Sequence, residues 1–170
     1  QAVRLLDLGA ETLTQHLEDH CQKYVVTGTT PDPDQTFFHG PDAISEITGR
    51  VAYQGDFWLK SIGLGGPRSH KATELFSRLI LEIVQMNWSP DHIVAFVPKR
   101  LAEKGVHLRY GFSHCELCCW IGPDQQVTDE EYFIWMNQKE LTQKLAKEPT
   151  MISRDEVSAS DGVVTLKAGA

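Results

Sequence analysis

The stretch SIGLGGPRSHKATEL, residues 61–75, has the residue types and spacing best suited to binding an anion. A long helix is expected to begin within it, and the first backbone amides of a helix have no intrahelical acceptor. Helix stability favours acidic residues in such a first turn, yet Arg68, His70 and Lys71 stand there instead. The pattern predicts a cradle for phosphate or pyrophosphate. The alternative is a surface turn whose basic side chains face solvent.

This stretch differs from the two common phosphate-binding motifs. It lacks the G-x-x-x-x-G-K-[ST] sequence of P-loops, and GLGG does not match the G-x-G-x-x-G of dinucleotide-binding folds. Gly65 and Gly66 would still let the backbone approach a ligand closely, because glycine has no side chain. A phosphate site here would therefore follow a pattern of its own.

Three residues elsewhere in the chain are candidates for proton transfer. His107 is a candidate general acid or base, because imidazole titrates near neutral pH, and Tyr110 is a second candidate acid. Glu46 is a candidate base that would deprotonate an amine nucleophile. The structural alternatives are a core or surface histidine, a packed tyrosine and a solvated carboxylate.

The cluster HCELCCW, residues 114–120, raises the question of a zinc or redox site. In a strand, Cys115 and Cys119 would point to one face and Cys118 to the other. Neither a second cysteine pair nor a close histidine pair is present to complete a tetrahedral site. We therefore expect reduced, structural cysteines and no bound metal.

Composition and charge limit the classes of partner. The 170 residues carry a formal charge of −7, which disfavours nucleic acid and anionic membrane surfaces as partners. No apolar run is long enough to span a membrane and no secretory signal is visible, so a soluble, cytoplasmic protein is expected. Length and patterning predict a single domain over residues 1–147, followed by a polar, flexible tail over residues 148–170.

The elements that would position these residues begin with a strand at VRLLDL. An amphipathic helix follows over residues 10–26, because Leu13, Leu17, Cys21 and Tyr24 recur at helical spacing and would form its apolar stripe. In the next segment, Pro41 and Gly49 could bracket a short helix, or residues 44–53 could form a strand; a short helix followed by a strand near residues 50–54 is favoured. Gly55 and Asp56 would form a tight turn into DFWLKSIGL, residues 56–64, giving a β-hairpin. The two strands of this hairpin therefore come directly before the basic turn, and the strand at VRLLDL precedes both.

Helical periodicity is strongest after that turn and predicts one helix over residues 69–88. The residues that fit the periodicity are Ala72, Leu75, Phe76, Leu79, Ile80, Ile83 and Val84. The apolar run HIVAFV, residues 92–97, predicts a strand buried on both faces and parallel to the strand before the helix. A short helix weakened by Gly105, two antiparallel strands at residues 114–121 and 131–136, and a short helix at residues 140–146 complete the chain.

This order of elements resembles the GNAT superfamily of N-acyltransferases over residues 56–136. In that family the glycine-rich turn binds the pyrophosphate of coenzyme A. The segment GGPRSHKA keeps Arg68 and the terminal small residue Ala72, whereas His70 and Pro67 depart from the family pattern. The family's later helix commonly ends in Tyr, three residues and Gly-Phe. Here His107 stands at that spacing from Gly111-Phe112, and Tyr110 directly precedes the pair.

The resemblance implies a mixed, mainly antiparallel sheet with a splayed, parallel central strand pair and flanking helices. It implies that acetyl-CoA or a longer acyl-CoA binds between residues 56–64 and 92–97 as co-substrate, without a metal. His107 or Tyr110 would handle the leaving thiolate. The implied cofactor-binding residues are Ile62, Leu64, Gly65, Gly66, Arg68, Ser69, His70, Lys71 and Ala72.

The expected activity is transfer of an acyl group to a small-molecule or peptide amine. Two alternatives remain open at this point. One is an autoinducer-synthase-like enzyme that takes its acyl chain from acyl-carrier protein. The other is a non-catalytic acyl-CoA-binding or protein-interaction domain of the same fold. The acceptor, the acyl-chain length and homodimer formation are also open.

Overall fold

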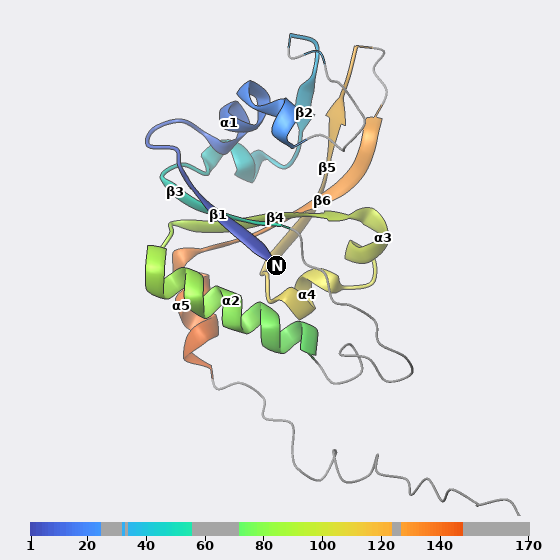
Figure 1. Cartoon of the computed structure of the whole chain (residues 1–170). Coiled ribbons are helices and arrows are strands. Elements are labelled where there is room, and N and C mark those ends of the chain that lie inside the picture. The colour runs from blue at the N-terminus through green and yellow to red at the C-terminus, as the bar shows by residue number, and fades with distance from the viewer. Residues whose placement is uncertain (25–31, 33, 56–71, 124–126, 148–170) are drawn as a thin grey trace, which may run out of the picture.

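The computed structural model describes residues 1–24, 32, 34–55, 72–123 and 127–147 (Figure 1). Helices and strands, with η for 3-10 helices, follow in the order β1 Ala2–Asp7, α1 Leu13–Asp19, η1 Cys21–Lys23, β2 Phe37–His39, η2 Asp42–Glu46, β3 Arg50–Gly55, α2 Ala72–Trp88, β4 His92–Pro98, α3 Lys99–Ala102, α4 Val106–Tyr110, β5 His114–Ile121, β6 Val127–Asn137 and α5 Gln138–Ala146. The predicted tail, residues 148–170, lies outside the described residues.

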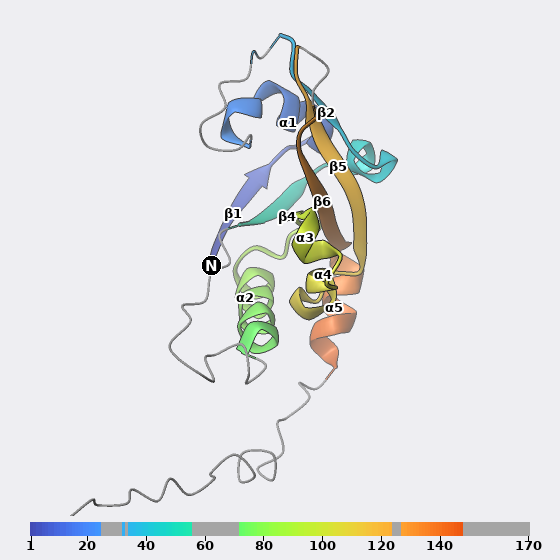
Figure 2. The same cartoon turned by 90° about the vertical axis from the view of Figure 1, so that its right-hand side faces the viewer.

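One six-stranded sheet organises these elements, with the strand order β1-β3-β4-β6-β5-β2. Among the described strands, β3 and β4 form the one parallel pair, and every other neighbouring pair is antiparallel. Figure 2 shows β5 and β6 curving along the molecule, so the sheet is curled. The expectation of an α/β fold with a mixed, mainly antiparallel sheet is confirmed.

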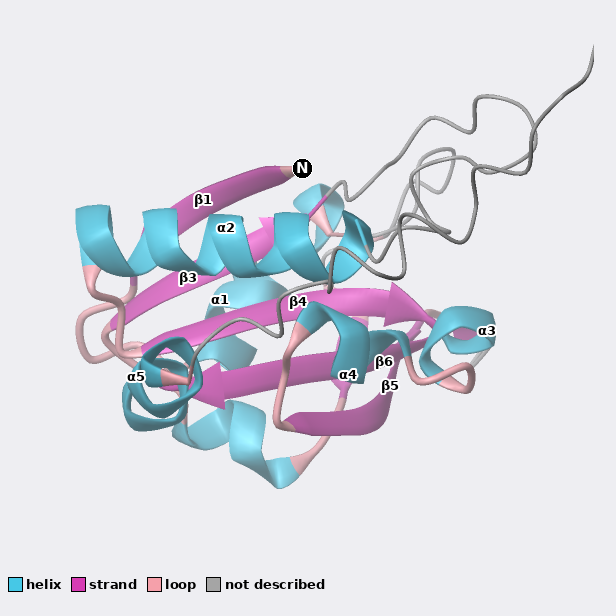
Figure 3. Ribbon diagram, turned by 90° about the horizontal axis from the view of Figure 1, so that it is seen from below, coloured by secondary structure: helices cyan, strands magenta, loops and turns pink. Residues whose placement is uncertain are grey.

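Alternating residues of the central strands bury two separate cores on opposite faces of the sheet. Val94 and Phe133 belong to a core that α1 and η2 cover, whereas Ile93 and Ile134 belong to a core that α2, α4 and α5 cover. These four side chains are 0 or 1% exposed. Figures 1 and 3 show α1 on one side of the sheet and α2, α4 and α5 on the other.

The parallel partner of β4 differs from the expected one. Val51 to Tyr53 of β3 pair with His92 to Val94 of β4, and the same three residues of β3 pair with β1 on the other side. Both edges of β3 are thus occupied there, so the expected hairpin with residues 56–64 does not form on residues 51–53. Val51 and Ala52 are fully buried, which suits a central strand better than the hairpin arm expected from the sequence. Residues 56–71 themselves lie outside the described part.

The first helix is shorter than expected. Thr12 caps α1, because its hydroxyl accepts from the backbone N–H of Gln15 and the Gln15 side chain accepts from the N–H of Thr12. The helix ends at Asp19 and continues as η1, so the periodicity over residues 10–26 overstated one α-helix. Leu13, Leu17 and Cys21 nevertheless pack into the core as their spacing predicted.

The long helix forms over Ala72–Trp88, and its predicted first residues, 69–71, lie outside the described part. Its buried residues are Ser77, Leu81 and Val84, of which only Val84 belongs to the predicted stripe, and Ile80 of the stripe packs partly buried against the core. Four residues of the stripe, Leu75, Phe76, Leu79 and Ile83, are exposed, as is Met86. The helix is apolar around most of its circumference, so periodicity alone did not select the side that packs on the sheet.

The second half of the chain follows the sequence expectations closely. Gly105, at φ +68°, separates two short helices, α3 and α4, where one weakened helix was expected. Strands β5 and β6 pair antiparallel across residues 122–126. Cys118 is buried in the core under α1, whereas Cys115 packs against the core on the opposite face, as strand alternation predicted. Phe37–His39 adds β2 at the far edge, beside β5.

Candidate functional site

A pocket of about 460 Å³ lies on the α1 side of the sheet. In the described part of the chain, residues of β1, β3, β4 and β6, and of η1 with the residue after it, contribute to its wall. We call it the sheet-end pocket, and its lining residues are Ala2, Val3, Arg4, Lys23, Tyr24, Tyr53, Gly55, Phe96 and Glu131.

The pocket coincides with the place where β3 and β4 stop pairing. Their recorded pairs end at Tyr53 and Val94, although β4 continues to Pro98. Gly55, the last residue of β3, and Phe96, in the half of β4 that pairs with β6 but not with β3, both line the pocket. It therefore lies at the carboxyl ends of the parallel strands, where open α/β sheets usually bind their ligands.

Aromatic rings form one wall of the pocket and hold Arg4 against it. The Tyr24 and Tyr53 rings meet edge to face with centroids 5.5 Å apart, and Phe96 follows at 6.0 Å from Tyr53. The guanidinium carbon of Arg4 lies 4.8 Å from the Tyr24 centroid and 4.9 Å from the Tyr53 centroid. Arg4 and Tyr53 are also register partners between β1 and β3, so their side chains share one face of the sheet.

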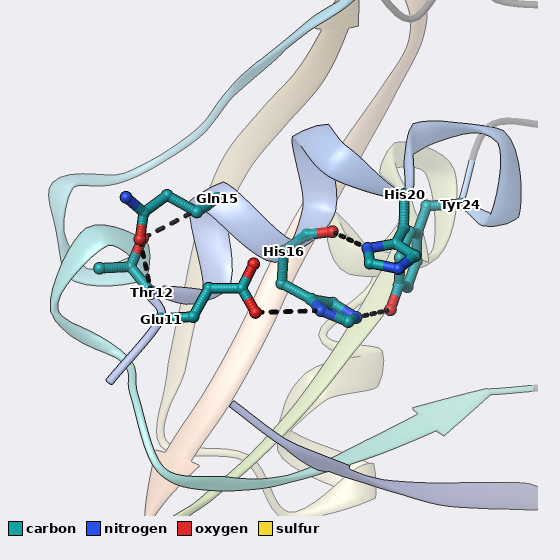
Figure 4. A network of polar contacts seen from close by, with 6 residues as sticks. All are labelled: Glu11, Thr12, Gln15, His16, His20 and Tyr24. Atoms are coloured by element: carbon teal, nitrogen blue, oxygen red, sulfur yellow. Dashed lines mark hydrogen bonds and ion pairs between the residues drawn. The ribbon is translucent and has the colours of Figure 1, made fainter. Parts of the chain in front are cut away.

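A chain of polar contacts connects Tyr24, which lines the pocket, with His16 and Glu11 (Figure 4). The Tyr24 hydroxyl lies 3.1 Å from Nε2 of His16, and Nδ1 of His16 lies 3.6 Å from Oε2 of Glu11. Nδ1 of His20 donates to the backbone carbonyl of His16 at 3.1 Å, and the two imidazole rings stack with centroids 4.5 Å apart. We refer to these contacts as the Glu11–His16–Tyr24 chain.

Electrostatics set the protonation of this chain at neutral pH. Burial lowers the pKa of His16, and nearby His20 lowers it further, while Glu11 opposes both effects. Burial raises the pKa of Tyr24, and Arg4 opposes that rise. His16 is therefore neutral and Tyr24 carries its hydroxyl proton. Because a carboxylate only accepts, the proton of neutral His16 belongs on Nδ1, and Nε2 accepts from Tyr24.

This arrangement suits a general base that acts through a hydroxyl. If a bound molecule gives a proton to the Tyr24 oxygen, the tyrosine can pass its own proton to Nε2 of His16. The resulting imidazolium would face Glu11, whose negative charge stabilises it. A carboxylate, an imidazole and a hydroxyl in series are the elements of many catalytic triads, here with a phenol at the pocket.

No family model, no curated protein and no solved structure matches the chain. The evidence for function therefore comes from the residues and their arrangement.

Most residues predicted to bind the cofactor lie outside the described part of the chain, namely Ile62, Leu64, Gly65, Gly66, Arg68, Ser69, His70 and Lys71. Ala72 is the exception and is the first residue of α2. The helix runs back along the sheet, so this end of α2 lies towards the carboxyl end of β4 (Figure 3). The predicted cradle is thus tethered at the end of the sheet where the pocket lies.

The three predicted proton-transfer residues do not form one cluster. Tyr110 is 9% exposed and belongs to the core that α2 and α5 cover. His107 lies one turn earlier on α4, and its buried Nδ1 has no hydrogen-bond partner among the described residues. Glu46 is exposed on η2, whose Ile44 packs into the core on the other face of the sheet. The catalytic roles of all three stay predictions.

Arg4, Glu11, His16 and Tyr24 were not recognised in the sequence as site residues. One signal was available, because His16, His20 and Tyr24 recur at intervals of four and would share one side of a helix. Tyr24 was instead assigned to the apolar stripe. The pairing of Arg4 with Tyr53 depends on the register between β1 and β3, which local sequence does not specify.

Metal sites and membrane-spanning helices are two further features that the described residues could contain. These residues include no group of three or more His, Cys, Asp or Glu placed to hold a metal ion. None of the helices in the described ranges has the length and apolar character needed to cross a membrane. The absence of zinc from the cysteine cluster stays a prediction.

Proposed function

We propose that the protein is an N-acyltransferase that moves an acyl group from acyl-CoA to an amine. The observation that carries this proposal is the position of the Glu11–His16–Tyr24 chain at a pocket where two parallel strands stop pairing. Acyl transfer from a thioester mainly requires positioning and proton management, which such a pocket can provide. The sequence resemblance to GNAT acyltransferases supports the same activity.

The order of elements provides a place for the donor. Gly55 lines the pocket and Ala72 begins α2, so the predicted phosphate cradle occupies the connection between them. A pyrophosphate held by Arg68 and the first amides of the helix would leave the thioester arm free to extend towards the pocket. The edge of β4 beyond Val94 has no recorded partner from β3 and offers backbone groups to such an arm.

The proposed reaction balances without a metal or a redox partner. The acceptor arrives as an ammonium and passes one proton through the Tyr24 hydroxyl to His16. The freed amine attacks the carbonyl carbon of the thioester, a C–N bond forms, and the C–S bond breaks. The thiolate leaves and takes up the second proton that the nitrogen loses, so the products are an amide and free CoA thiol. His16 then returns its proton to solvent.

Donor binding is the first experiment. CoA, acetyl-CoA and longer acyl-CoAs are compared by thermal unfolding, since a ligand at 100 times its dissociation constant stabilises a protein by about 2.7 kcal/mol. Arg68→Ala should weaken CoA binding by about 1.5 to 3 kcal/mol, which is the range for a charge-assisted hydrogen bond. Arg109→Ala, at an exposed position on α4, is the matched control and should bind CoA normally.

Turnover is the second experiment. Release of free CoA thiol from acetyl-CoA or a longer acyl-CoA is followed in the presence of candidate amines, and acylated amine is identified by mass spectrometry. Binding without thiol release would favour the non-catalytic acyl-CoA-binding domain. Release from acyl-carrier protein alone would favour the autoinducer-synthase-like enzyme. Failure of every donor to bind or react would overturn the proposal.

A further inference from the structure

We infer that the acceptor is an amine that also carries a carboxylate, and that Arg4 binds this carboxylate in the sheet-end pocket. The inference rests on the proposed function, because it names the chemical class of the acceptor for that activity. Three features of the pocket support it. They are the placement of Arg4, the charges of the described lining residues and the closeness of Arg4 to Tyr24.

The guanidinium of Arg4 is held in place before any ligand arrives. It lies 4.8 and 4.9 Å from the centroids of Tyr24 and Tyr53, and these two rings are nearly perpendicular to each other. A planar guanidinium can lie face to face with only one of two perpendicular rings, and a hydrogen bond of Arg4 to Tyr24 uses part of its N–H edge. A guanidinium has five N–H donors, so donors remain for a carboxylate, which accepts charge-assisted hydrogen bonds from them.

The charged groups of the pocket favour an anion, although the whole chain carries a formal charge of −7. Among the described residues of the lining, Arg4 and Lys23 carry positive charges and Glu131 carries a negative charge. The two cationic side chains give the pocket a local attraction for an anion within an acidic protein.

The anion site and the proton acceptor lie on the same tyrosine. Arg4 stacks on the ring of Tyr24, whose hydroxyl contacts His16. A ligand held by Arg4 would therefore have its neighbouring atoms close to the Tyr24 hydroxyl. In an α- or β-amino acid the amine is one or two carbons from the carboxylate, so that spacing would place the amine at the group that takes its proton.

A phosphate of CoA is a second source of negative charge for the same guanidinium. The carboxylate is favoured because the predicted phosphate cradle precedes Ala72, whereas Arg4 lies on β1 in an aromatic wall. The two sources give different results for Arg4 variants, because one changes the binding of the acceptor and the other changes the binding of CoA.

The test measures binding of amino acids and of their carboxamides, without any donor, by calorimetry. The twenty common amino acids, β-alanine and 4-aminobutyrate are each paired with the carboxamide of the same compound. At least one acid should bind ten times or more tighter than its carboxamide. Arg4→Gln should abolish this preference, Arg4→Lys should retain part of it, and Arg109→Gln should leave it unchanged.

The outcomes separate this inference from the proposed function. Equal affinity for acid and carboxamide, failure of every acid to bind, or a full preference in folded Arg4→Gln would overturn the inference. If acyl transfer to simple amines still occurs, the proposed function stands alone. If an acid binds through Arg4 but no thiol is released from any donor, the anion site stands and the transferase proposal fails. Reduced CoA affinity in Arg4→Gln, with the acid preference intact, would assign Arg4 to the donor phosphate.

Discussion

Nε2 of His16 lies 3.1 Å from the hydroxyl oxygen of Tyr24, although the chain changes from α-helix to 3-10 helix between them. The contact points a neutral imidazole at a tyrosine that lines the sheet-end pocket. Glu11 lies on the other side of the imidazole ring. The predictions on catalysis below follow from this relationship.

Removing either member of the contact should slow catalysis and leave the fold intact. Tyr24→Phe keeps the ring that meets Tyr53 edge to face and contacts Arg4 but loses the hydroxyl, and His16→Gln loses the titrating imidazole. Each should lower kcat/KM for acyl transfer by a factor of about 10² to 10⁴, the usual range for general acid–base catalysis. The rate of CoA thiol release measures the effect.

His39→Gln is the control for this prediction, because His39 is exposed on β2 and is not part of the Glu11–His16–Tyr24 chain. Its rate should equal that of the original protein. Full activity in both Tyr24→Phe and His16→Gln would show that proton transfer occurs elsewhere, with His107 and Tyr110 as the next residues to test.

The pH dependence of kcat/KM should report the base. His16 accepts a proton only in its neutral form, and burial with His20 nearby lowers its pKa below the ordinary value of about 6.5. Activity should therefore be constant near pH 7 and fall only below about pH 6.5. Glu11→Gln removes the one nearby charge that raises the pKa, so it should move the acid limb to still lower pH. A limb that does not move would contradict the assignment of His16.

Stability should fall on acidification because His92 resists protonation in the folded state. Burial lowers its pKa, and its buried Nδ1 has no hydrogen-bond partner within the described ranges. The unfolded chain takes up a proton at a higher pH than the folded chain, so the free energy of unfolding decreases as pH falls below about 6.5. Urea unfolding from pH 7.5 to 5.5 should show a smaller decrease in His92→Leu. An equal decrease would contradict this role of His92.

Gly111→Ala should destabilise the end of α4 for two separable reasons. Gly111 has φ +91°, and a Cβ there would overlap Cε of Lys144. Gly9→Ala isolates the free-energy cost of the left-handed backbone, because Gly9 has φ +56° and no described atom lies within 4 Å of a Cβ placed there. Gly9→Ala should cost about 1 to 2 kcal/mol of unfolding free energy, and Gly111→Ala should cost more.

The clash at Gly111 can be tested by shortening its neighbour. In a Lys144→Ala background, Gly111→Ala should cost about as much as Gly9→Ala, because only the left-handed backbone conformation is then penalised. If the cost of Gly111→Ala is the same in both backgrounds, the lysine does not crowd this position. Thermal and urea unfolding of the four variants give the required differences.

The sequence predicted the helices and strands whose causes are local. Apolar runs indicated β4, β5 and β6, and the turn residues near Pro41 and Gly49 indicated a short helix before β3. It predicted the antiparallel pairing of β5 with β6 but not the partners of β3, because the edges of β3 are taken by β1 and β4, which are distant in sequence. It also did not predict the buried side of α2, where Ser77 is buried and Leu75 is exposed.

The candidate site depends almost entirely on such long-range pairing. Arg4 reaches Tyr24 and Tyr53 through the β1–β3 register and the position of α1 above the sheet. No local pattern contains that information. The basic turn around Arg68 was visible in the sequence because its chemistry conflicts with the helix dipole, which is a local rule.

A crystal structure of the protein with bound CoA would test the account most directly, because it locates the sulfur atom. The account predicts the pyrophosphate at the turn before Ala72 and the sulfur in the sheet-end pocket, within about 4 Å of the Tyr24 hydroxyl, a distance from which a positioned group can act on a reacting atom. Arg4 should remain against the rings of Tyr24 and Tyr53, within reach of an acceptor. A sulfur atom bound away from the pocket, or no binding of CoA at millimolar concentration, would contradict the proposal that acyl transfer takes place there.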